Sequence, residues 1–242
     1  MKVTFFGTSS GTARKNRRNT SIFFEIGAHK YIFDMGCNAV EDLHNRDLHC
    51  EQIDAIFISH MHGDHVNGLL PFLGNIDRPS RLGADPLICL PPPMEQTIKA
   101  INAWRNCTNH QEYRTYRYQE IEEGTFYDDG TLKVTAYRTA HCWMSFSFLL
   151  EAEGKRVYFS GDFSREPENE FPYEILEQPL DAAICELGHF SAEKYNIIFA
   201  EKQPKKMYIT HVSTRFAETI PPFAASVDYP VTEAYDGLEF EV

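Results

Sequence analysis

The chain has 242 residues, enough for one large domain or two small ones. Its composition, with 43% hydrophobic and 24% charged residues, is that of a folded globular protein and excludes a mostly disordered chain. Acidic residues outnumber basic ones by 35 to 23, which gives a formal net charge of −12. This acidity disfavours a surface that coats nucleic acid without regard to its sequence.

The first half of the chain predicts short strands that alternate with helices. The strands are expected at 3–6, 21–26, 30–34, 55–59 and 87–90, and the helices at 38–48, 66–73 and 94–106. The segment 55–59 is a continuous apolar run, which is typical of a strand buried on both faces.

The second half predicts more strands than helices. The strands are expected at 133–137, 145–150, 156–160, 182–187, 207–210 and 238–242, with one helix at 192–203. The alternation of strands and helices indicates a layered α/β or α+β protein. No repeat, low-complexity tract or linker interrupts the pattern, so we expect residues 1–242 to form one domain.

Cellular location is predicted only indirectly. No stretch of about 18 apolar residues is present, so no membrane-spanning helix is expected. The N-terminal region lacks the apolar core of a signal peptide. The six cysteines are scattered without a C-x-x-C pair. These features predict reduced thiols in a cytoplasmic protein.

A cluster of metal-binding residue types follows the apolar run at 55–59. Residues 59–65 read Ser-His-Met-His-Gly-Asp-His, which supplies His60, His62, Asp64 and His65. The first two histidines can converge on one metal if the chain leaves the strand in extended form, and the glycine permits a turn toward a second position. Imidazole nitrogen and carboxylate oxygen suit zinc, and also iron or manganese.

Three later polar residues have the same placement just beyond an apolar strand. They are His141 in Thr-Ala-His-Cys, Asp162 in Ser-Gly-Asp and His211 in Ile-Thr-His. One such residue alone is more often a cap or turn residue. Because open α/β sheets collect ligands at strand ends, agreement among four strand ends favours a shared metal site.

The motif H-x-H-x-D-H at 60–65, with the later His and Asp residues, resembles the metallo-β-lactamase superfamily. The resemblance covers nearly the whole chain and implies an α/β (α+β) four-layer αββα sandwich with a dinuclear metal site at one edge of its two sheets. It also implies a ligand set for two divalent ions, with zinc expected and manganese or iron as alternatives. The first ion would be held by His60, His62 and His141, the second by Asp64, His65 and His211, and both by a bridging Asp162.

Within the superfamily, the chain is most similar to the ribonuclease Z group and its phosphodiesterase relatives. Three segments carry this resemblance, Phe-Gly-Thr-Ser-Ser-Gly-Thr at 6–12, Arg-Asn-Thr at 18–20 and Thr-His-Val-Ser-Thr-Arg-Phe at 210–216. Glu-Leu-Gly-His at 186–189 resembles the position of an extra histidine that assists proton transfer. The resemblance thus implies catalytic roles for His189, as proton donor, and for Asp64, as a ligand that also orients a neighbour; a plain loop histidine is the alternative for His189.

One departure from the tRNA-processing members affects the expected substrate. As the resemblance implies, those members carry a long insertion that forms a flexible arm and grips the tRNA. Here only one expected hairpin, at 145–160, separates His141 from Asp162, so no arm fits there.

Two further features are candidates for substrate binding. The basic run Arg14, Lys15, Arg17 and Arg18 could recruit a phosphate to the rim of the site, or could equally be a solvated loop. Five aromatic residues could stack on a base, although core packing is their more frequent use. They are Trp104, Tyr113, Tyr116, Tyr118 and Trp143, of which Trp143 is the best candidate because it lies next but one to His141.

The leading hypothesis is a dinuclear-metal phosphodiesterase that acts on small or cyclic phosphodiesters or on short nucleic-acid ends. The alternatives are a ribonuclease Z-type tRNA 3′ endonuclease, an ester, thioester or lactam hydrolase on the same fold, and a metal-binding protein without turnover. A diiron redox protein is least favoured because position 62 is His. A homodimer is expected by family analogy only.

Overall fold

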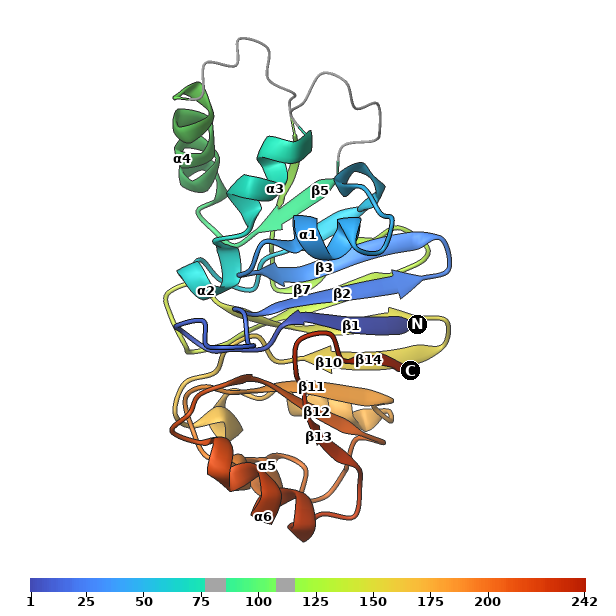
Figure 1. Ribbon diagram of the computed structural model, residues 1–242. Helices are drawn as coiled ribbons and strands as arrows, with labels where there is room; N and C mark the ends of the chain where they lie inside the picture. The colour runs from blue at the N-terminus through green and yellow to red at the C-terminus, as the bar shows by residue number, and fades with distance from the viewer. Residues whose placement is uncertain (77–85, 108–115) are drawn as a thin grey trace.

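The computed structural model describes residues 1–76, 86–107 and 116–242. Two seven-stranded sheets lie face to face, with helices on both outer faces (Figure 1). In spatial order, the first sheet contains β14 (Glu239–Glu241), β1 (Lys2–Gly7), β2 (Ser21–Ile26), β3 (His29–Met35), β4 (Ala55–Phe57), β5 (Leu87–Leu90) and β6 (Arg117–Glu120). The second contains β13 (Val231–Glu233), β12 (Met207–Val212), β11 (Ala182–Leu187), β10 (Lys155–Phe159), β9 (Phe146–Ala152), β8 (Lys133–Arg138) and β7 (Gly124–Asp128).

The two sheets have the same internal plan. Each has an antiparallel part, β14-β1-β2-β3 in the first and β7-β8-β9-β10 in the second. Each continues into parallel strands, β3-β4-β5-β6 and β10-β11-β12-β13. The carboxyl ends of the parallel strands therefore gather at one edge of each sheet, where ligands collect in α/β proteins.

The main core lies between the sheets and is rich in aromatic rings. The ring centroid of Phe33 on β3 is 5.7 Å from that of Phe148 on β9 and 6.2 Å from that of Phe159 on β10. Because side chains alternate along a strand, Ile32 points the other way and joins the cluster beneath the helices. Both faces of β3 are thus buried.

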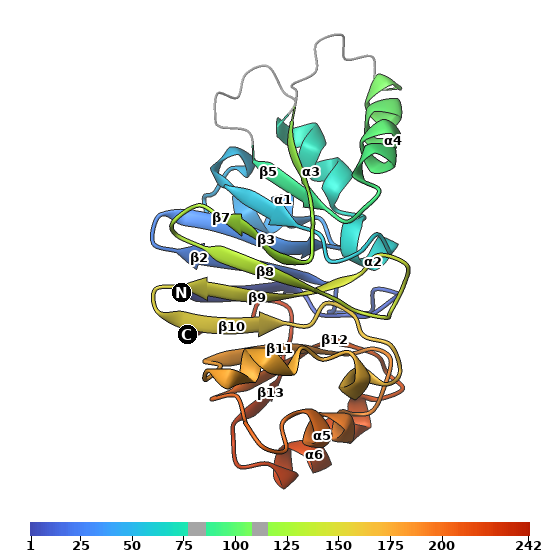
Figure 2. The ribbon, with the colours of Figure 1, turned by 180° about the vertical axis from the view of Figure 1, so that it is seen from behind.

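Helices cover the outer faces of both sheets (Figures 1 and 2). The first sheet carries α1 (Ala39–His44), α2 (Gly63–Val66), α3 (Leu69–Ile76) and α4 (Met94–Asn106), and the second carries α5 (Tyr195–Ile198) and α6 (Ile220–Ser226). Short 3₁₀ turns occur at Cys50–Gln52, Pro167–Asn169, Tyr173–Glu177, Ala192–Lys194 and Ala217–Thr219. The protein is therefore an αββα sandwich, as predicted. Among the described residues, no helix has the length and apolar character needed to cross a bilayer.

Two helix predictions need correction. The helix expected at 192–203 is wrong in length, because a 3₁₀ turn and the single turn α5 replace it. Pro204 disfavours helical backbone just before it, and Phe199 already leaves the helical region. The helix expected at 66–73 divides into α2 and α3 at Gly68, whose N–H donates to the Met35 carbonyl at 2.7 Å.

The short strands β6, β7 and β13 and the helix α6 were not predicted. Their sequences lack a clear apolar period, because β6 and β7 are only partly buried and α6 has two prolines directly after its first residue. Proline suits the first turn of a helix, where its missing N–H has no partner to lose. The predicted hairpin between His141 and Asp162 is confirmed as β9 and β10.

Candidate metal centre

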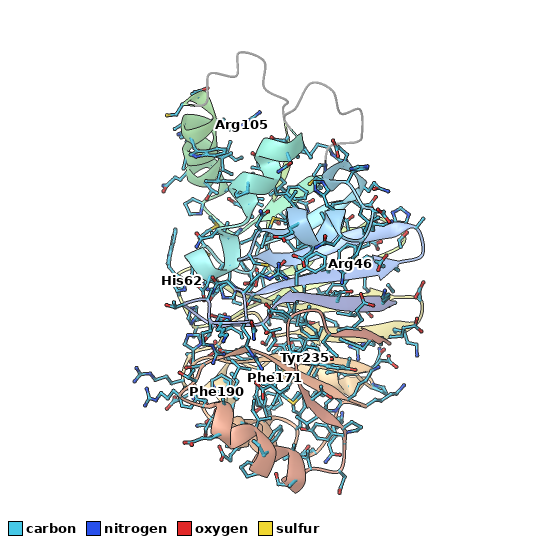
Figure 3. The ribbon with its side chains drawn as sticks, viewed as in Figure 1. Arg46, His62, Arg105, Phe171, Phe190 and Tyr235 are labelled. Atoms are coloured by element: carbon cyan, nitrogen blue, oxygen red, sulfur yellow. The ribbon has the colours of Figure 1, made fainter. Side chains whose placement is uncertain are left out.

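The seven candidate ligands come together at the edge where the parallel strands end. His60 follows β4, Asp162 follows β10 and His211 lies in β12, while His141 lies in the turn between β8 and β9. The other three belong to α2 and the residue before it. Figure 3 shows His62 at this edge, beside α2. The structure thus brings together side chains from both sheets at one edge of the sandwich.

Three imidazoles form one compact group. The Nδ1 atom of His62 lies 3.0 Å from Nε2 of His60 and 3.0 Å from Nε2 of His141. Three nitrogen atoms that face a common point are the donor set of a catalytic zinc site, in which a fourth position stays open.

A second group lies beside the first. The Oδ2 atom of Asp64 is 3.7 Å from Nε2 of His65 and 3.7 Å from Nε2 of His211. These two nitrogens and one oxygen form another set of potential ligands. Asp64 also accepts a hydrogen bond from the Gly11 N–H at 2.6 Å. The Gly-rich segment at 6–12 therefore holds this carboxylate in place.

Asp162 lies between the two groups. Its Oδ2 atom is 3.2 Å from Nε2 of His211, 3.3 Å from that of His65, 3.6 Å from that of His141 and 3.8 Å from that of His60. One carboxylate oxygen is thus almost equally distant from nitrogens of both groups. This is the position that a bridging ligand requires.

The donor atoms fit metal ions because two of them are buried without a hydrogen-bond partner. These are Nε2 of His65 and Oδ1 of Asp162. A buried polar atom without a partner costs about 1–3 kcal/mol, so such atoms in a native fold need an explanation. Coordination of a divalent ion provides one.

Side chains behind the ligands fix their orientation. Asp34 is fully buried at the end of β3 and accepts hydrogen bonds from His65 Nδ1 at 2.7 Å and from the Ser59 hydroxyl at 2.8 Å. The Thr20 hydroxyl is hydrogen-bonded to His211 Nδ1 at 2.7 Å. Such partners set the tautomer of a ligating imidazole. Sequence reasoning missed these residues, although an aspartate at the end of an apolar strand was an available signal.

Burial and charge favour the metal-binding forms of His60 and Asp162. For His65, burial lowers the pKa, but the carboxylates of Asp162 and Asp34 outweigh this and raise it well above its usual range. Burial lowers the pKa of His60, and the nearby His65 adds to the effect. Burial alone would raise the pKa of Asp162, but the charges of the nearby His211 and His65 hold it well below its usual range. A neutral imidazole and an ionised carboxylate are the ligating forms.

His189 lies at the mouth of this centre. Its Nδ1 atom is 2.9 Å from Oε1 of the fully buried Glu186 and 4.0 Å from Oδ2 of Asp162. Its ring centroid is 4.5 Å from that of His141. Burial lowers the pKa of His189, but the hydrogen bond and charge of Glu186 outweigh this and raise it to about 9. The contact with Glu186 therefore favours the protonated form of His189.

Most of the basic run is occupied by contacts within the protein. Arg17 Nη2 lies 2.5 Å from Oε1 of Glu233, and Arg18 Nη1 lies 2.6 Å from Oδ2 of Asp42. Arg14 Nη2 donates to the Val212 carbonyl at 2.5 Å. Lys15 is exposed. These arginines hold the 11–19 loop against β12, β13 and α1.

The aromatic candidates differ in how far they are exposed to solvent. Trp143 is 70% exposed beside His141, which suits contact with a ligand. Tyr116 is buried, and its hydroxyl donates to the Leu73 carbonyl at 3.0 Å, so it packs in the core. Trp104 is 40% exposed on α4, and Tyr118 is half-buried on β6. Tyr113 lies outside the described residues.

The αββα fold with this edge site defines a protein of the metallo-β-lactamase superfamily, in its ribonuclease Z-like branch. The chain belongs to the family described as anti-Pycsar protein Apyc1, whose model matches residues 1–182. The matched range contains all the candidate ligands except His211.

Two curated relatives of this chain are both named ribonuclease Z. The chain is 23% identical to that of Methanothermobacter thermautotrophicus, over 98% of this chain and 95% of the relative. It is 30% identical to that of Crocosphaera subtropica, over 58% of this chain but only 45% of the relative. The second match therefore spans less than half of that protein.

Two solved structures share the fold over the whole chain. The metallo-β-lactamase fold protein YhfI from Bacillus subtilis has a TM-score of 0.82 and 20% identity, and covers 100% of this chain and 99% of its own. The short form of human tRNase Z has a TM-score of 0.77 and 22% identity, with the same coverage. At these identities the likeness shows the fold.

Proposed function

We propose that this protein is a dinuclear-metal phosphodiesterase that acts on small or cyclic phosphodiesters or on short nucleic-acid ends, with residues 1–242 as one hydrolase domain. The fold, the clustered ligands and the ribonuclease Z relatives support the broader class of metal-dependent nuclease or phosphodiesterase. The observation that carries the proposal is the position of Asp162 Oδ2, within 3.2 to 3.8 Å of four imidazole nitrogens.

The ligand assignment follows the two groups of donor atoms. His60, His62 and His141 would hold one divalent ion, and Asp64, His65 and His211 the other, with Asp162 shared. When bound, such ions acidify water, so that a nucleophile forms near neutral pH, and neutralise charge on phosphoryl oxygens. The histidine-rich set favours zinc, with manganese or iron as alternatives.

His189 has the geometry of a proton donor. Its Nδ1 atom is engaged by Glu186, which leaves Nε2 to face the substrate. The Glu186 carboxylate raises the pKa of His189 and so favours the imidazolium, which carries a proton on Nε2. We assign it to protonate the departing alkoxide oxygen, or to hold a phosphoryl oxygen, within hydrogen-bond reach. Asp64, which accepts a hydrogen bond from the Gly11 N–H, would keep His65 and His211 in position.

The connection between His141 and Asp162 favours a small substrate. It consists of the β9–β10 hairpin, which closes at Glu153 and Gly154, so it has no room for an arm that could grip a tRNA body. The net charge of −12 also repels a long polyanion away from the metal edge. The similarity to ribonuclease Z keeps a tRNA 3′ endonuclease as the second candidate.

An activity screen with metal analysis on the same sample tests this proposal. We expect two equivalents of metal per chain, hydrolysis of bis(4-nitrophenyl) phosphate and of cyclic nucleotides, and poor cleavage of a precursor tRNA. Preferential tRNA cleavage would favour the endonuclease. Turnover of thioesters, lactones or lactams alone would indicate an enzyme that hydrolyses carbonyl compounds and not phosphodiesters. Full metal content without any turnover would indicate a non-catalytic metal protein. Light scattering tests the expected homodimer.

A further inference from the structure

Two of the candidate ligands lie on separate irregular segments of the chain. His141 belongs to the turn between β8 and β9, and Asp162 lies in the segment that follows β10. An irregular segment lacks the regular hydrogen bonds of a helix or strand, so other contacts have to satisfy its backbone groups and fix its position. The contacts that join these two segments therefore set the position of one ligand relative to the other.

The half-buried carboxylate of Glu170 joins the two segments. Its Oε2 atom accepts a hydrogen bond from the Ala140 N–H, and its Oε1 atom accepts one from the Ser164 N–H at 2.6 Å. Ala140 directly precedes His141, and Ser164 is the second residue after Asp162. One side chain thus holds the backbone of both segments, with each of its oxygens bound to a different segment.

Glu170 is itself anchored in the fold. It follows the 3₁₀ turn Pro167–Asn169, and its N–H donates to the Pro167 carbonyl at 3.2 Å. The next residue, Phe171, is buried in the core on the outer face of the second sheet. Its ring centroid is 5.1 Å from that of Tyr158 on β10. The carboxylate is therefore presented from a segment whose position is fixed by core packing.

The contacts of the Asp162 segment do not end with Glu170. The N–H of the residue after Asp162 donates to Oε1 of the buried Glu186 at 2.8 Å. The Asp162 carbonyl also accepts a hydrogen bond from the Thr139 hydroxyl at 2.8 Å. The contact of Glu170 beside His141 is made to the residue next to that histidine. Loss of the Glu170 contacts should therefore displace His141 more than Asp162.

A carboxylate of this length suits the two donors. Both of its oxygens accept hydrogen bonds, whereas an amide has one accepting oxygen and an NH₂ group that only donates. Hydrogen bonds to an ionised acceptor are also the stronger ones. Among the described residues, the groups that could hold a metal do not include Glu170. Its carboxylate thus acts on the backbone of the ligand segments.

We infer that Glu170 is a positioning residue, which aligns His141 with Asp162 and thereby sets how tightly the first ligand group holds its ion. This inference rests on the ligand assignment in the proposed function. It gives a role to a carboxylate that lies outside the ligand motif and outside the ribonuclease Z-like segments.

Glu170→Gln removes one of the two acceptors while keeping the shape of the side chain. We expect the Zn²⁺ affinity of the first group to fall about tenfold or more, as measured by competition with a chromophoric chelator. His141→Ala identifies the binding step that depends on this histidine. Glu170→Asp keeps the charge but is one methylene shorter, so it should lose affinity too. Wild-type affinity in Glu170→Asp would mean that only the charge matters and would overturn the inference.

Glu168→Gln is the matched control. Glu168 lies in the neighbouring 3₁₀ turn, and its carboxylate pairs with Lys194. Its affinity should equal that of the wild type. The Tm of each variant in EDTA shows whether the metal-free protein is folded. A loss of affinity as large in Glu168→Gln as in Glu170→Gln would overturn the inference.

A double-mutant cycle shows whether Glu170 acts through His141. In the His141→Ala background, Glu170→Gln should cause no further loss of Zn²⁺ affinity. An equal loss in both backgrounds would overturn the positioning role.

These measurements use no substrate, so they separate the inference from the proposed function. If the affinities follow the expected pattern but no phosphodiester is hydrolysed, the positioning role stands and the proposed function fails. If phosphodiesters are hydrolysed and Glu170→Gln keeps wild-type affinity, the positioning role fails and the proposed function stands. A chain that binds no divalent ion would overturn both.

Discussion

The two ends of the sandwich carry similar residue types that differ in their hydrogen bonding. Beyond the carboxyl end of β4 lie the candidate ligands, whereas His29 begins β3 and Asp54 precedes β4 at the opposite end. That opposite end contains a hollow of about 470 Å³ with three aspartates in its lining. By cavity size and acidic content it would be the better candidate for a site.

Hydrogen bonding distinguishes the two ends. At the far end, Asp129 accepts hydrogen bonds from the hydroxyls of Tyr31 and Tyr127 at 2.6 and 2.7 Å, and from two backbone N–H groups at 2.8 Å. At the metal edge, buried atoms of His65 and Asp162 have no partner. The metal edge thus gathers ligand-type atoms that lack partners, whereas the Asp129 carboxylate at the far end is held by four hydrogen bonds.

The largest expected effect is that of Asp162→Ala. Activity on bis(4-nitrophenyl) phosphate should fall at least about a hundredfold, because the shared ligand of both ions is lost. Bound metal should also decrease after dialysis, as measured by atomic emission. Asp129→Asn at the far end should keep full metal content. An unaffected Asp162→Ala enzyme would contradict the bridging assignment.

The loss of activity in His189→Ala should depend on the leaving group of the substrate. For an alkyl leaving group we expect a loss of about 10²-fold or more, since proton donation is lost, and a much smaller loss for 4-nitrophenolate, which leaves without a proton. His29→Ala is the control, because His29 Nδ1 lies 3.3 Å from an Asp54 oxygen in a similar pair at the far end. Equal losses for both leaving groups would argue against a proton donor.

Asp34→Asn should weaken the centre without removing a ligand. We expect about a 10- to 100-fold loss of metal affinity, because the amide no longer orients and polarises His65 as the carboxylate does. Competition with a chromophoric chelator measures it. Asp54→Asn changes the same type of residue at the other end of the sheet and should leave the affinity at the wild-type value. Equal affinities in the two variants would exclude an orienting role for Asp34.

The smallest expected effect is on stability at the far end. Burial alone would raise the pKa of Asp129, but hydrogen bonds from the Leu132 N–H and the two tyrosines lower it below the ordinary aspartate value of 3.8. Its ionised form therefore adds stability above that value, and this is lost as the pH falls through the folded-state pKa. In EDTA, Asp129→Asn should lower Tm by about a few degrees at neutral pH, with the difference shrinking toward pH ~2. A pH-independent difference would contradict this origin.

The candidate ligands were predictable because each one follows an apolar strand in the sequence. A strand's apolar run and the polar residue that ends it are local features, and parallel strands bring such ends to one edge. The partners behind the ligands were not predictable in this way. Thr20 and His211 are 191 residues apart in the chain, so only the fold shows that they meet.

The contacts of the basic run were not predictable from its sequence either. Its sequence is equally consistent with a phosphate-recruiting rim and with a solvated loop. In the structure, Arg17 and Arg18 instead pair with Glu233 and Asp42, which come from opposite ends of the chain. Charge patterning cannot predict such pairs, because it contains no information on which distant carboxylate lies nearby.

The sequence by itself determined the ligand types, their order and the strands that precede them, because periodicity and turn residues act over a few positions. Tertiary structure alone decided which atoms meet around Asp162 and which side chains stand behind His65 and His211. These features depend on contacts between segments far apart in the chain, whose geometry is set only when both sheets pack on their common core.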